Sequence, residues 1–395
     1  MRSVGVEEEL LLVDPDSGEP LAVAGVVLAA AERAGATRPG PAGGPVEKAE
    51  DRTPVASGPS GGDDPDVPAL ESELHEEQLE FATKPVTEMG ELQEEIVRLR
   101  AEAARHAETA GAVVAALATS PLPVRPTLSP GHRYDWAARQ FGMTAQEQLT
   151  CGCHVHVAVE SDEEGVAVLD RIRPWLPVLT AMSANSPYWQ GEDTRYASYR
   201  GRVWNRLPSA GPTDLFGSAD AYHEQVRAMV GTGVLRDPAM IYFDARLSAT
   251  YPTVEVRAAD VCLDPSTPVL LAALVRGLVE TAARAWRGGE PPARTATGLL
   301  RLASWQAARS GLDGPLLHPA TMEPVTPAEA VDALYRHVAD ALADAGDAEL
   351  VRAGTARLLE HGNGARVQRA LARSEDGLAA AVRHCARLTT AAASG

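Results

Sequence analysis

The stretch VGVEEELLLV, residues 4–13, decides the fold, because three consecutive glutamates interrupt an otherwise apolar run. Valine and leucine in such a run favour a buried β-strand. Side chains alternate between the two faces of a strand, so Glu7 and Glu9 point together and Glu8 points to the other face. A buried carboxylate is costly unless something positive meets it. The sequence therefore predicts a positive partner for this strand; the alternative is an edge strand with a solvated acidic face.

Glu7 and Glu9 are candidate metal ligands. The rise of a strand separates them by roughly 7 Å, and two carboxylates in one semi-buried site are hard to ionise unless a cation neutralises them. Magnesium is a hard ion that takes oxygen ligands and keeps waters for phosphate groups. We therefore interpret this strand face as part of a magnesium site.

The stretch ELHEEQLEFAT, residues 73–83, is the second acidic segment, and we expect it to be a strand. Alternation places Glu73 on one face and Glu80 on the other. Both can face one site only if the strand bulges or twists between them. An exposed strand or an amphipathic helix is the alternative interpretation.

A third segment, TCGCHVHVAVE at 150–160, alternates sharply and contains four side chains that are typical zinc ligands: Cys151, Cys153, His154 and His156. On a regular strand the thiols and the imidazoles point to opposite faces, so the four cannot close around one ion. We expect the histidine face, opened by Gly152, to look into a site and the thiol face to pack. The alternative is that the two histidines only form hydrogen bonds within a sheet and have no role in a site.

The last strand-like motif is TVEVRAAD, residues 253–260, where Glu255 and Arg257 share a face. An acid beside a guanidinium suits a site that holds both a cation and phosphate oxygens. A salt bridge on a sheet face is the other interpretation of this pair.

The densest cationic and aromatic cluster lies in residues 188–206. It comprises Arg195, Arg200, Arg202 and Arg206 among Tyr188, Trp189, Tyr196, Tyr199 and Trp204. Such a cluster could bind nucleic acid, but the chain has 54 acidic against 36 basic residues and a net charge of -18. This negative field favours small anions, such as a substrate carboxylate or nucleotide phosphates.

Composition excludes several other classes. The only lysines are Lys48 and Lys84, so no G-x-x-x-x-G-K-[ST] phosphate loop exists, and the G-x-S-x-G match at 58–62 lacks the flanking strand and helix of a nucleophile elbow. Four cysteines in 395 residues predict reduced thiols and no disulfide framework. The longest apolar run that we identify, 21–31, is too short to span a bilayer, and no signal peptide is recognisable. We expect a soluble cytoplasmic protein without a membrane partner.

The remaining pattern predicts one α+β domain over residues 1–395. We expect a Pro-, Gly- and acid-rich mobile loop at about 38–68, and a helical C-terminal part at about 266–395 that supports the strands. A strand pair is expected at 240–248 and 253–260. Helices are expected at 21–35, 91–117, 162–187 (interrupted by Pro174 and Pro177), 267–287, 295–310, 326–344, 347–360 and 375–391.

The motifs, taken in order, resemble the glutamate-cysteine ligase type 2 family, in particular its bacterial carboxylate-amine ligase branch. The resemblance extends from Val4 to G-N-G-A-R near residue 362. It rests on G-V-E-E-E, E-L-H-E-E-Q-L-E, G-C-H-V-H-V, S-A-N-S-P-Y-W-Q-G with Y-A-S-Y-R-G-R-V-W, and Y-P-T-V-E-V-R-A-A-D. It implies a glutamine-synthetase-like fold, in which a curved, mainly antiparallel sheet forms a funnel with helices packed outside.

The same resemblance implies that ATP and magnesium bind in the funnel. The expected metal ligands are Glu7, Glu9, Glu73, Glu80, His154 and Glu255. The residues expected to act on the reacting groups are His154, Arg200, Arg202 and Arg257, and those expected at the nucleotide are His156, Arg202, Trp204 and Arg257. Glu8 is expected outside the metal shell.

The implied activity is ATP-dependent ligation of a glutamate-like carboxylate to an amine, cysteine or another amino compound, through an acyl phosphate. The expected partners are these small molecules, with no nucleic acid, and a homodimer is a further expectation. A metal-dependent amide hydrolase on the same fold is the alternative enzyme class. A non-catalytic protein that binds a metal or an amino acid is the third hypothesis.

Overall fold

The strand that contains the three glutamates lies in the middle of the sheet. The computed structural model describes residues 1–33, 70–374 and 376–391. Its seven-stranded sheet has the order β2 (Leu70–Ser72), β3 (Gln78–Ala82), β1 (Val4–Val13), β5 (Gly152–Ala158), β9 (Thr253–Asp260) and β8 (Ala245–Leu247), and β4 (Val113–Ala115) also pairs with β1. All of these pairings are antiparallel, which confirms the expected sheet. The predicted mobile loop lies outside the described residues.

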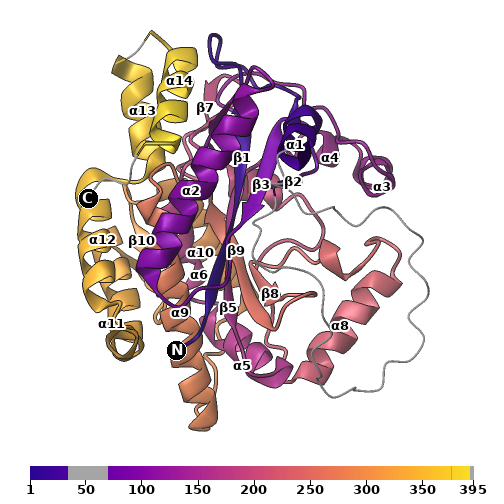
Figure 1. Ribbon diagram of the computed structural model, residues 1–395. Coiled ribbons are helices and arrows are strands. Elements are labelled where there is room, and N and C mark those ends of the chain that lie inside the picture. Colours follow the sequence, from indigo (N-terminus) through magenta and orange to yellow (C-terminus); the bar gives the residue numbers. More distant parts are fainter. Residues whose placement is uncertain (34–69, 375, 392–395) are drawn as a thin grey trace.

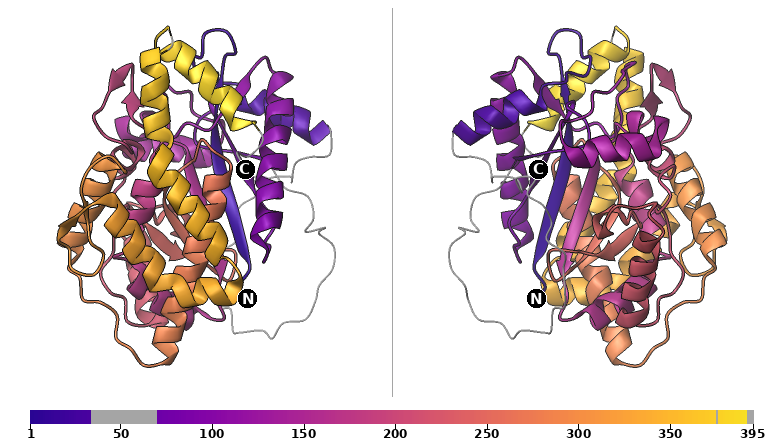
Figure 2. Two further views of the ribbon diagram at one scale, coloured as in Figure 1. Left: turned by 90° about the vertical axis from the view of Figure 1, so that its left-hand side faces the viewer. Right: turned by 90° about the vertical axis from the view of Figure 1, so that its right-hand side faces the viewer.

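Helices surround this sheet (Figure 1). Those of the first two thirds are α1 (Ala24–Arg33), α2 (Met89–Glu108), α3 (His132–Phe141), α4 (Met143–Gln146), α5 (Asp162–Ile172), α6 (Leu176–Ser183), α7 (Arg200–Trp204) and α8 (Ala219–Gly231). The C-terminal ones are α9 (Ser266–Arg287), α10 (Thr297–Ser310), α11 (Pro327–Ala345), α12 (Ala348–His361), α13 (Gly364–Ser374) and α14 (Leu378–Thr389). Two short hairpins, β6–β7 (Tyr188–Trp189, Glu192–Asp193) and β10–β11 (Leu316–Leu317, Pro324–Val325), complete the fold with a 3-10 turn at Pro238–Met240. Figure 2 shows the orange to yellow helices gathered on one side of the molecule, as the helical C-terminal prediction required.

Two apolar clusters hold the layers together. One lies where β5 and β9 meet α5, α6, α9 and α11, and includes Val155, Val256 and Leu274. The other lies where the end of β1 meets α1, α2, β4 and α14, and includes Leu12 and Leu99. Burial of such side chains contributes about 1.5–3 kcal/mol each. The helices therefore bury one face of the sheet and leave the other for polar side chains.

Two predicted elements are wrong at their boundaries. The second acidic segment is not one strand: β2 and β3 form an antiparallel pair in which Glu71 faces Glu80, and the chain reverses between Glu73 and Glu77. No bulge is therefore needed to bring the two ends of the segment together. The helix predicted to reach residue 117 ends at Glu108, because Gly111 adopts a left-handed φ of +73° and the following residues form β4. Helices α3, α8 and α13 and the short helices α4 and α7 were not predicted.

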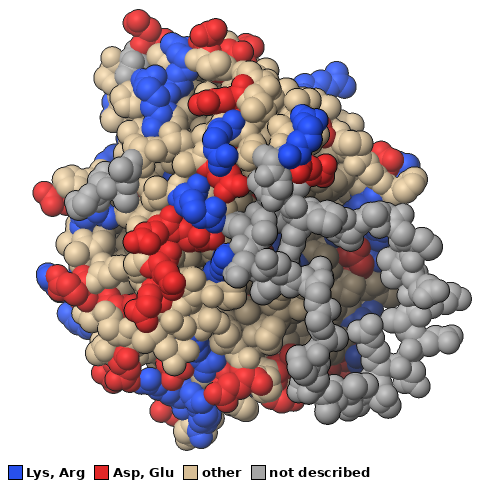
Figure 3. All heavy atoms as spheres, viewed as in Figure 1, with Lys and Arg blue, Asp and Glu red and all other residues tan. Residues whose placement is uncertain are grey.

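Helix α9 is long and apolar enough to cross a membrane by length and composition, but 78% of its most apolar window is buried within the described fold. It is the core helix of this domain. Surface helix α2 differs from it, since its outer side carries acidic and basic side chains next to one another (Figure 3). There Arg98 bonds Glu95 and Glu102, each at 2.9 Å.

Candidate active site

Ionisable side chains occupy one face of five neighbouring strands, which we call the site face. Its members are Glu80 on β3, Glu7 and Glu9 on β1, His154 and His156 on β5, Glu255 and Arg257 on β9, and Asp244 and Arg246 at β8. Cross-strand register produces this face, because residues directly opposite in an antiparallel pair point the same way. Glu9 pairs with Glu80 and Glu7 pairs with His154. His156 pairs with Glu255, which in turn pairs with Arg246.

The side chains meet in two groups that could each hold a metal ion. Glu7, His154 and Glu255 form one, and Glu9, Glu80 and His154 form the other; within each group the ligand atoms lie within 4.8 Å of one another. His154 Nδ1 is 3.1 Å from Glu7 Oε2, and its Nε2 is 3.7 Å from Glu9 Oε1. The structure therefore brings five of the six expected metal ligands together.

Glu73, the sixth expected ligand, lies beside these groups and belongs to neither. It follows β2, and its carboxylate accepts a hydrogen bond from Leu74 N at 3.0 Å. Its charge nevertheless reaches the site face, because it contributes to raising the pKa of both Glu9 and Glu80. The segment reversal, and not a bulge, places Glu73 here.

The electrostatics of the carboxylates divide into two patterns. Burial, with the charge of Glu73, raises the pKa of Glu9 to about 7, and burial raises that of Glu80 well above its usual value. Burial also opposes ionisation of Glu7, but hydrogen bonds with His154 and His156 hold its pKa well below normal. Clustered carboxylates that resist ionisation are what a divalent cation would neutralise.

Glu255 is already held by two arginines. Arg246 Nε and Nη2 donate to its oxygens at 2.7 and 3.2 Å, and Arg257 Nη1 bonds Oε1. Despite burial, the charges of Arg257 and Arg246 lower its pKa to about 2. Glu255 thus forms the salt bridge that was the alternative interpretation of this motif. Its carboxylate also lies beside Glu7 and His154, as the metal-site interpretation expects.

Helix α7 carries Arg200 to the site. This side chain is 2% exposed, and its guanidinium lies 5.5 Å from the ring centre of Trp204, as does that of Arg257. It also lies against Gly152, where a Cβ would be 2.3 Å from Nη2. The absence of a side chain at Gly152 therefore makes room for the arginine, and the Gly152 N–H donates to Glu9 Oε2 at 2.6 Å.

Several buried nitrogen atoms of the site have no hydrogen-bond partner among the described residues. They are Nε and Nη2 of Arg200, Nε of Arg202 and Arg257, and Nε2 of His154; Nε2 of His156 is 3.1 Å from Glu7 Oε1. Most buried polar atoms in native proteins are hydrogen-bonded, so each such atom requires an explanation. Guanidinium groups bind carboxylates and phosphates particularly well. The arginines therefore fit an anionic ligand, and Nε2 of His154 fits a metal ion.

Glu8 lies on the opposite face, as its place in the strand predicts, and its partner is an arginine that sequence reasoning missed. Arg100 of α2 donates from Nε and Nη2 to the two oxygens of Glu8 at 2.8 and 2.7 Å, and neither side chain is more than 1% exposed. Arg100 also donates to the carbonyls of Cys262 and Leu263 at 2.6 and 3.0 Å. Arg100 is thus the positive partner of Glu8 within the protein itself.

The cysteines lie outside both groups that could hold a metal ion. All four are free and buried, and no cysteine belongs to a potential metal group within the described part of the chain. Burial raises the pKa of the Cys151 and Cys153 thiols well above the usual value, which disfavours the thiolate that binds zinc. The thiols pack in the apolar clusters while His154 and His156 face the site, as the alternation predicts.

Two further residues of the site face were missed. Arg246 holds Glu255, and Asp244 lies next to Arg257, whose backbone N–H donates to the Asp244 carbonyl at 2.9 Å. Burial raises the pKa of Asp244 to about 6, although the charges of Arg202 and Arg200 act in the opposite direction. Alternation along MIYFDARLS, extended one residue before β8, would have placed both on the same face as Glu255.

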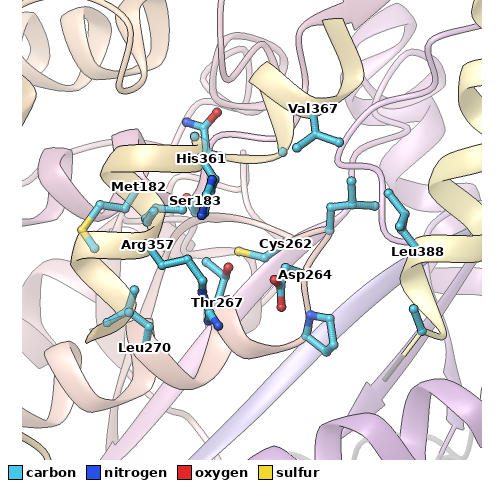
Figure 4. A pocket seen from close by; sticks show the side chains of 18 residues that line it. Met182, Ser183, Cys262, Asp264, Thr267, Leu270, Arg357, His361, Val367 and Leu388 are labelled. Atoms are coloured by element: carbon cyan, nitrogen blue, oxygen red, sulfur yellow. The ribbon is translucent and has the colours of Figure 1, made fainter. Parts of the chain in front are cut away.

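A cavity of about 300 Å³ lies elsewhere, between α9, α12, α13 and the end of α14 (Figure 4). Its wall includes Ser183, Asp264, Arg357 and His361, and none of the site-face carboxylates. It is separate from the candidate active site.

Known proteins resemble this chain in sequence and in fold. The family model described as "Glutamate-cysteine ligase family 2" matches residues 3–384. A Streptomyces avermitilis protein called "Putative glutamate--cysteine ligase 2-1" is 59% identical over 98% of this chain and 99% of its own length. A Streptomyces coelicolor protein called "Putative glutamate--cysteine ligase 2" is 56% identical over 99% of this chain and 100% of its own.

Among solved structures, a glutamate-cysteine ligase from Francisella tularensis in complex with AMP has a TM-score of 0.66 at 12% identity, over 98% of this chain and 88% of that one. A bifunctional glutathione synthetase from Pasteurella multocida has a TM-score of 0.62 at 14% identity, over 98% of this chain and 52% of that one. At these identities the likeness concerns the fold. The sequence matches cover nearly the whole chain, and the chain therefore belongs to glutamate-cysteine ligase family 2 and is a ligase.

Proposed function

We propose that this ligase is ATP-dependent and joins a glutamate-like carboxylate to the amine of cysteine or of another amino compound. One observation carries the proposal: carboxylates and histidines from β1, β3, β5 and β9 meet beside buried guanidinium nitrogens that have no hydrogen-bond partner among the described residues. A site that binds both a metal ion and phosphate oxygens needs this combination. The complex of the Francisella relative with AMP supports a nucleotide as one ligand.

The donor set fits magnesium. Glu7, Glu9, Glu80 and Glu255 offer hard oxygen donors, whereas the buried thiols that would favour zinc lie away from the groups. Magnesium and ATP, when bound, would supply charge neutralisation and the phosphoryl group that activates a carboxylate as an acyl phosphate. We propose that Glu73 does not bind the metal ion directly and that its negative charge acts on Glu9 and Glu80.

The protein's own part is to bind and orient. Arg200 and Arg257, both in contact with the Trp204 ring, would hold the transferring phosphoryl or the substrate carboxylate, and Arg202 would extend the same positive surface. Low-dielectric surroundings strengthen such contacts. His154 would complete the metal shell, while His156 is oriented by Thr253, 3.0 Å from its Nδ1. We also propose that His156 and Trp204 border the nucleotide.

The two other hypotheses have less support. No observation favours a metal-dependent amide hydrolase, and the cluster of buried arginines beside the carboxylates would be unnecessary for simple activation of water. A purely binding protein would not need so many ionisable groups in one buried place. The four free cysteines agree with a reducing compartment, so a cytoplasmic location is part of the proposal.

The test is incubation of the protein with ATP, magnesium and pooled amino acids, followed by measurement of ADP and by mass spectrometry for a new amide. The proposal expects both products, in equal amounts, only when ATP is present. Formation of an amide without nucleotide turnover, or ADP release that no added acid or amine stimulates, would contradict it. A Glu9→Gln variant serves as the inactive control.

A further inference from the structure

Arg200 is placed by a loop that has little regular structure, so its position depends on specific contacts. Asp260, the last residue of β9, provides the first of them. Its Oδ2 accepts hydrogen bonds from Asn185 N at 2.8 Å and from Ser186 Oγ at 2.7 Å, and its Oδ1 accepts one from Ser198 Oγ at 2.8 Å. Asp260 is fully buried. A single carboxylate thus joins both ends of the loop to the central sheet.

The connection continues to Arg200 itself. Ser186 Oγ, which donates to Asp260, accepts a hydrogen bond from Arg200 N at 3.0 Å. Tyr199 N donates to Ser186 O, also at 3.0 Å. The start of α7 therefore cannot move without breaking bonds that lead back to Asp260.

The second contact comes from α13 and explains the G-N-G-A-R motif, which the proposed chemistry does not use. Gln368 Nε2 donates to Asn185 O and Oδ1 at 2.8 and 2.7 Å, and Ala365 N donates to Ala184 O at 3.0 Å. Gly364 lies against Asn185 so closely that a Cβ would be 2.0 Å from its Oδ1. Asn185 is itself fixed, because its Nδ2 donates to Ala116 O and Val261 O at 2.7 and 2.8 Å.

We propose that Asp260, Gly364 and Gln368 are positioning residues, which set the location of the Arg200 guanidinium without touching a reactant. This inference rests on the proposed function, which assigns Arg200 to an anionic reactant. The guanidinium cannot hold itself in place, since its buried Nε and Nη2 have no partner among the described residues. Displacement of a reacting group by 1 Å can lower a rate by about 100-fold.

The surroundings allow such a displacement without global unfolding. Ser183, whose Oγ accepts a hydrogen bond from Asp260 N at 3.2 Å, and Gly364 both line the cavity of about 300 Å³ (Figure 4). Packed interiors resist movement, whereas a neighbouring void lets it be absorbed locally. The junction between α13 and the loop can therefore shift while the sheet stays intact.

The experiment compares Asp260→Asn, Gly364→Ala and Gln368→Met with a matched control, Gly298→Ala. Gly298 is a glycine of α10 whose added Cβ would meet nothing within 4 Å. We expect the three variants to lower kcat/KM between about 10- and 100-fold. If Arg200→Gln changes KM for one reactant, or kcat, the three variants should change that same parameter. The kcat/KM of the control should stay within about twofold of that of the wild type.

A double-mutant cycle separates positioning from general damage. In the Arg200→Gln background, Asp260→Asn should cost less than about threefold, because residues that act through one group are not additive. Multiplicative losses in the double variant, or a loss that only reflects a smaller active fraction with KM unchanged, would overturn the proposal.

Hydrogen exchange gives a second, activity-independent measurement. Amides of residues 196–204 should exchange faster in Asp260→Asn and Gly364→Ala than in Gly298→Ala. Unchanged exchange in both variants would also overturn the proposal. If wild type itself forms neither ADP nor amide, the proposed function fails, and this exchange comparison alone decides whether the loop is held as described.

Discussion

Replacement of Glu8 by glutamine should destabilise the protein while leaving its chemistry intact. The carboxylate of Glu8 faces away from the site and makes two hydrogen bonds with Arg100, at 2.8 and 2.7 Å, in a region with almost no solvent exposure. Glutamine keeps the shape of the side chain but removes the charge, and its amide group cannot accept from the second guanidinium N–H. Arg100 would then be a buried cation without a counter-charge.

The expected cost is about 3–5 kcal/mol, the range for removing one partner of a buried ion pair. Unfolding entropies of about 2.1 cal/mol/K per residue give about 0.8 kcal/mol/K for 395 residues, so the melting temperature should fall by about 4–6 °C. Arg100 keeps its hydrogen bonds to the carbonyls of Leu263 and Cys262 in the variant, so the loss of stability should not exceed about 5 kcal/mol.

The assay is calorimetry, which measures the melting temperature of each variant, with Glu102→Gln as the matched control. Glu102 lies on the same helix as Arg100 and bonds Arg98 at 2.9 Å, but Arg98 is 46% exposed. An exposed pair contributes less than about 1 kcal/mol, so the control should shift the melting temperature by about 1 °C or less. Equal shifts for the two variants would refute the reasoning, as would loss of turnover in folded Glu8→Gln at low temperature.

Three further predictions concern the site. Glu9→Gln should abolish ADP formation and yet melt no lower than wild type at pH 8 without magnesium, because it removes a buried charge whose pKa is raised; a destabilised variant would contradict this. The folded pKa of about 7 for Glu9 lies above its unfolded value, so this group's contribution to metal-free stability falls as pH rises from about 4.5 to 7, and magnesium must displace its proton. The magnesium-induced rise in melting temperature should therefore be larger at pH 8 than at pH 6, and the opposite order in calorimetry would disprove the metal assignment. Cys151→Ser should keep nearly full turnover, and release of bound zinc from wild type, measured with a chromophoric chelator, would argue otherwise.

Alternation along strands was enough to predict most of the site. The positions of Glu7, Glu9, His154 and His156 follow from the period of two, and the structure places these side chains on one face. The period also assigned Glu8 to the other face. It could not identify Arg100, because the partner comes from a helix whose distance from β1 is set by tertiary packing. A charged residue next to Leu99 in the apolar stripe of α2 was the available signal.

The errors have local physical causes. The turn between β2 and β3 contains neither glycine nor proline, so nothing in the segment around His75 marks a reversal, and its acids read as one strand. The alanine- and valine-rich run after Gly111 suits a helix and a buried strand equally well, and pairing with β1 decides between them. The local sequence of neither segment shows which strand it will pair with, and that pairing determines its structure.

The central place of β1 has a consequence for synthesis of the protein. Strand β1 precedes its partners β3, β4 and β5 in the chain, and the side chains on its site face gain their remaining neighbours only when β9, near residue 255, has been made. During translation Val4 and Val6 of β1 therefore lack the members of their apolar cluster that lie on β9 and α9 until those segments have been made, which favours aggregation of nascent or truncated chains. Fragments that stop before β9 should accordingly depend on chaperones to stay in solution.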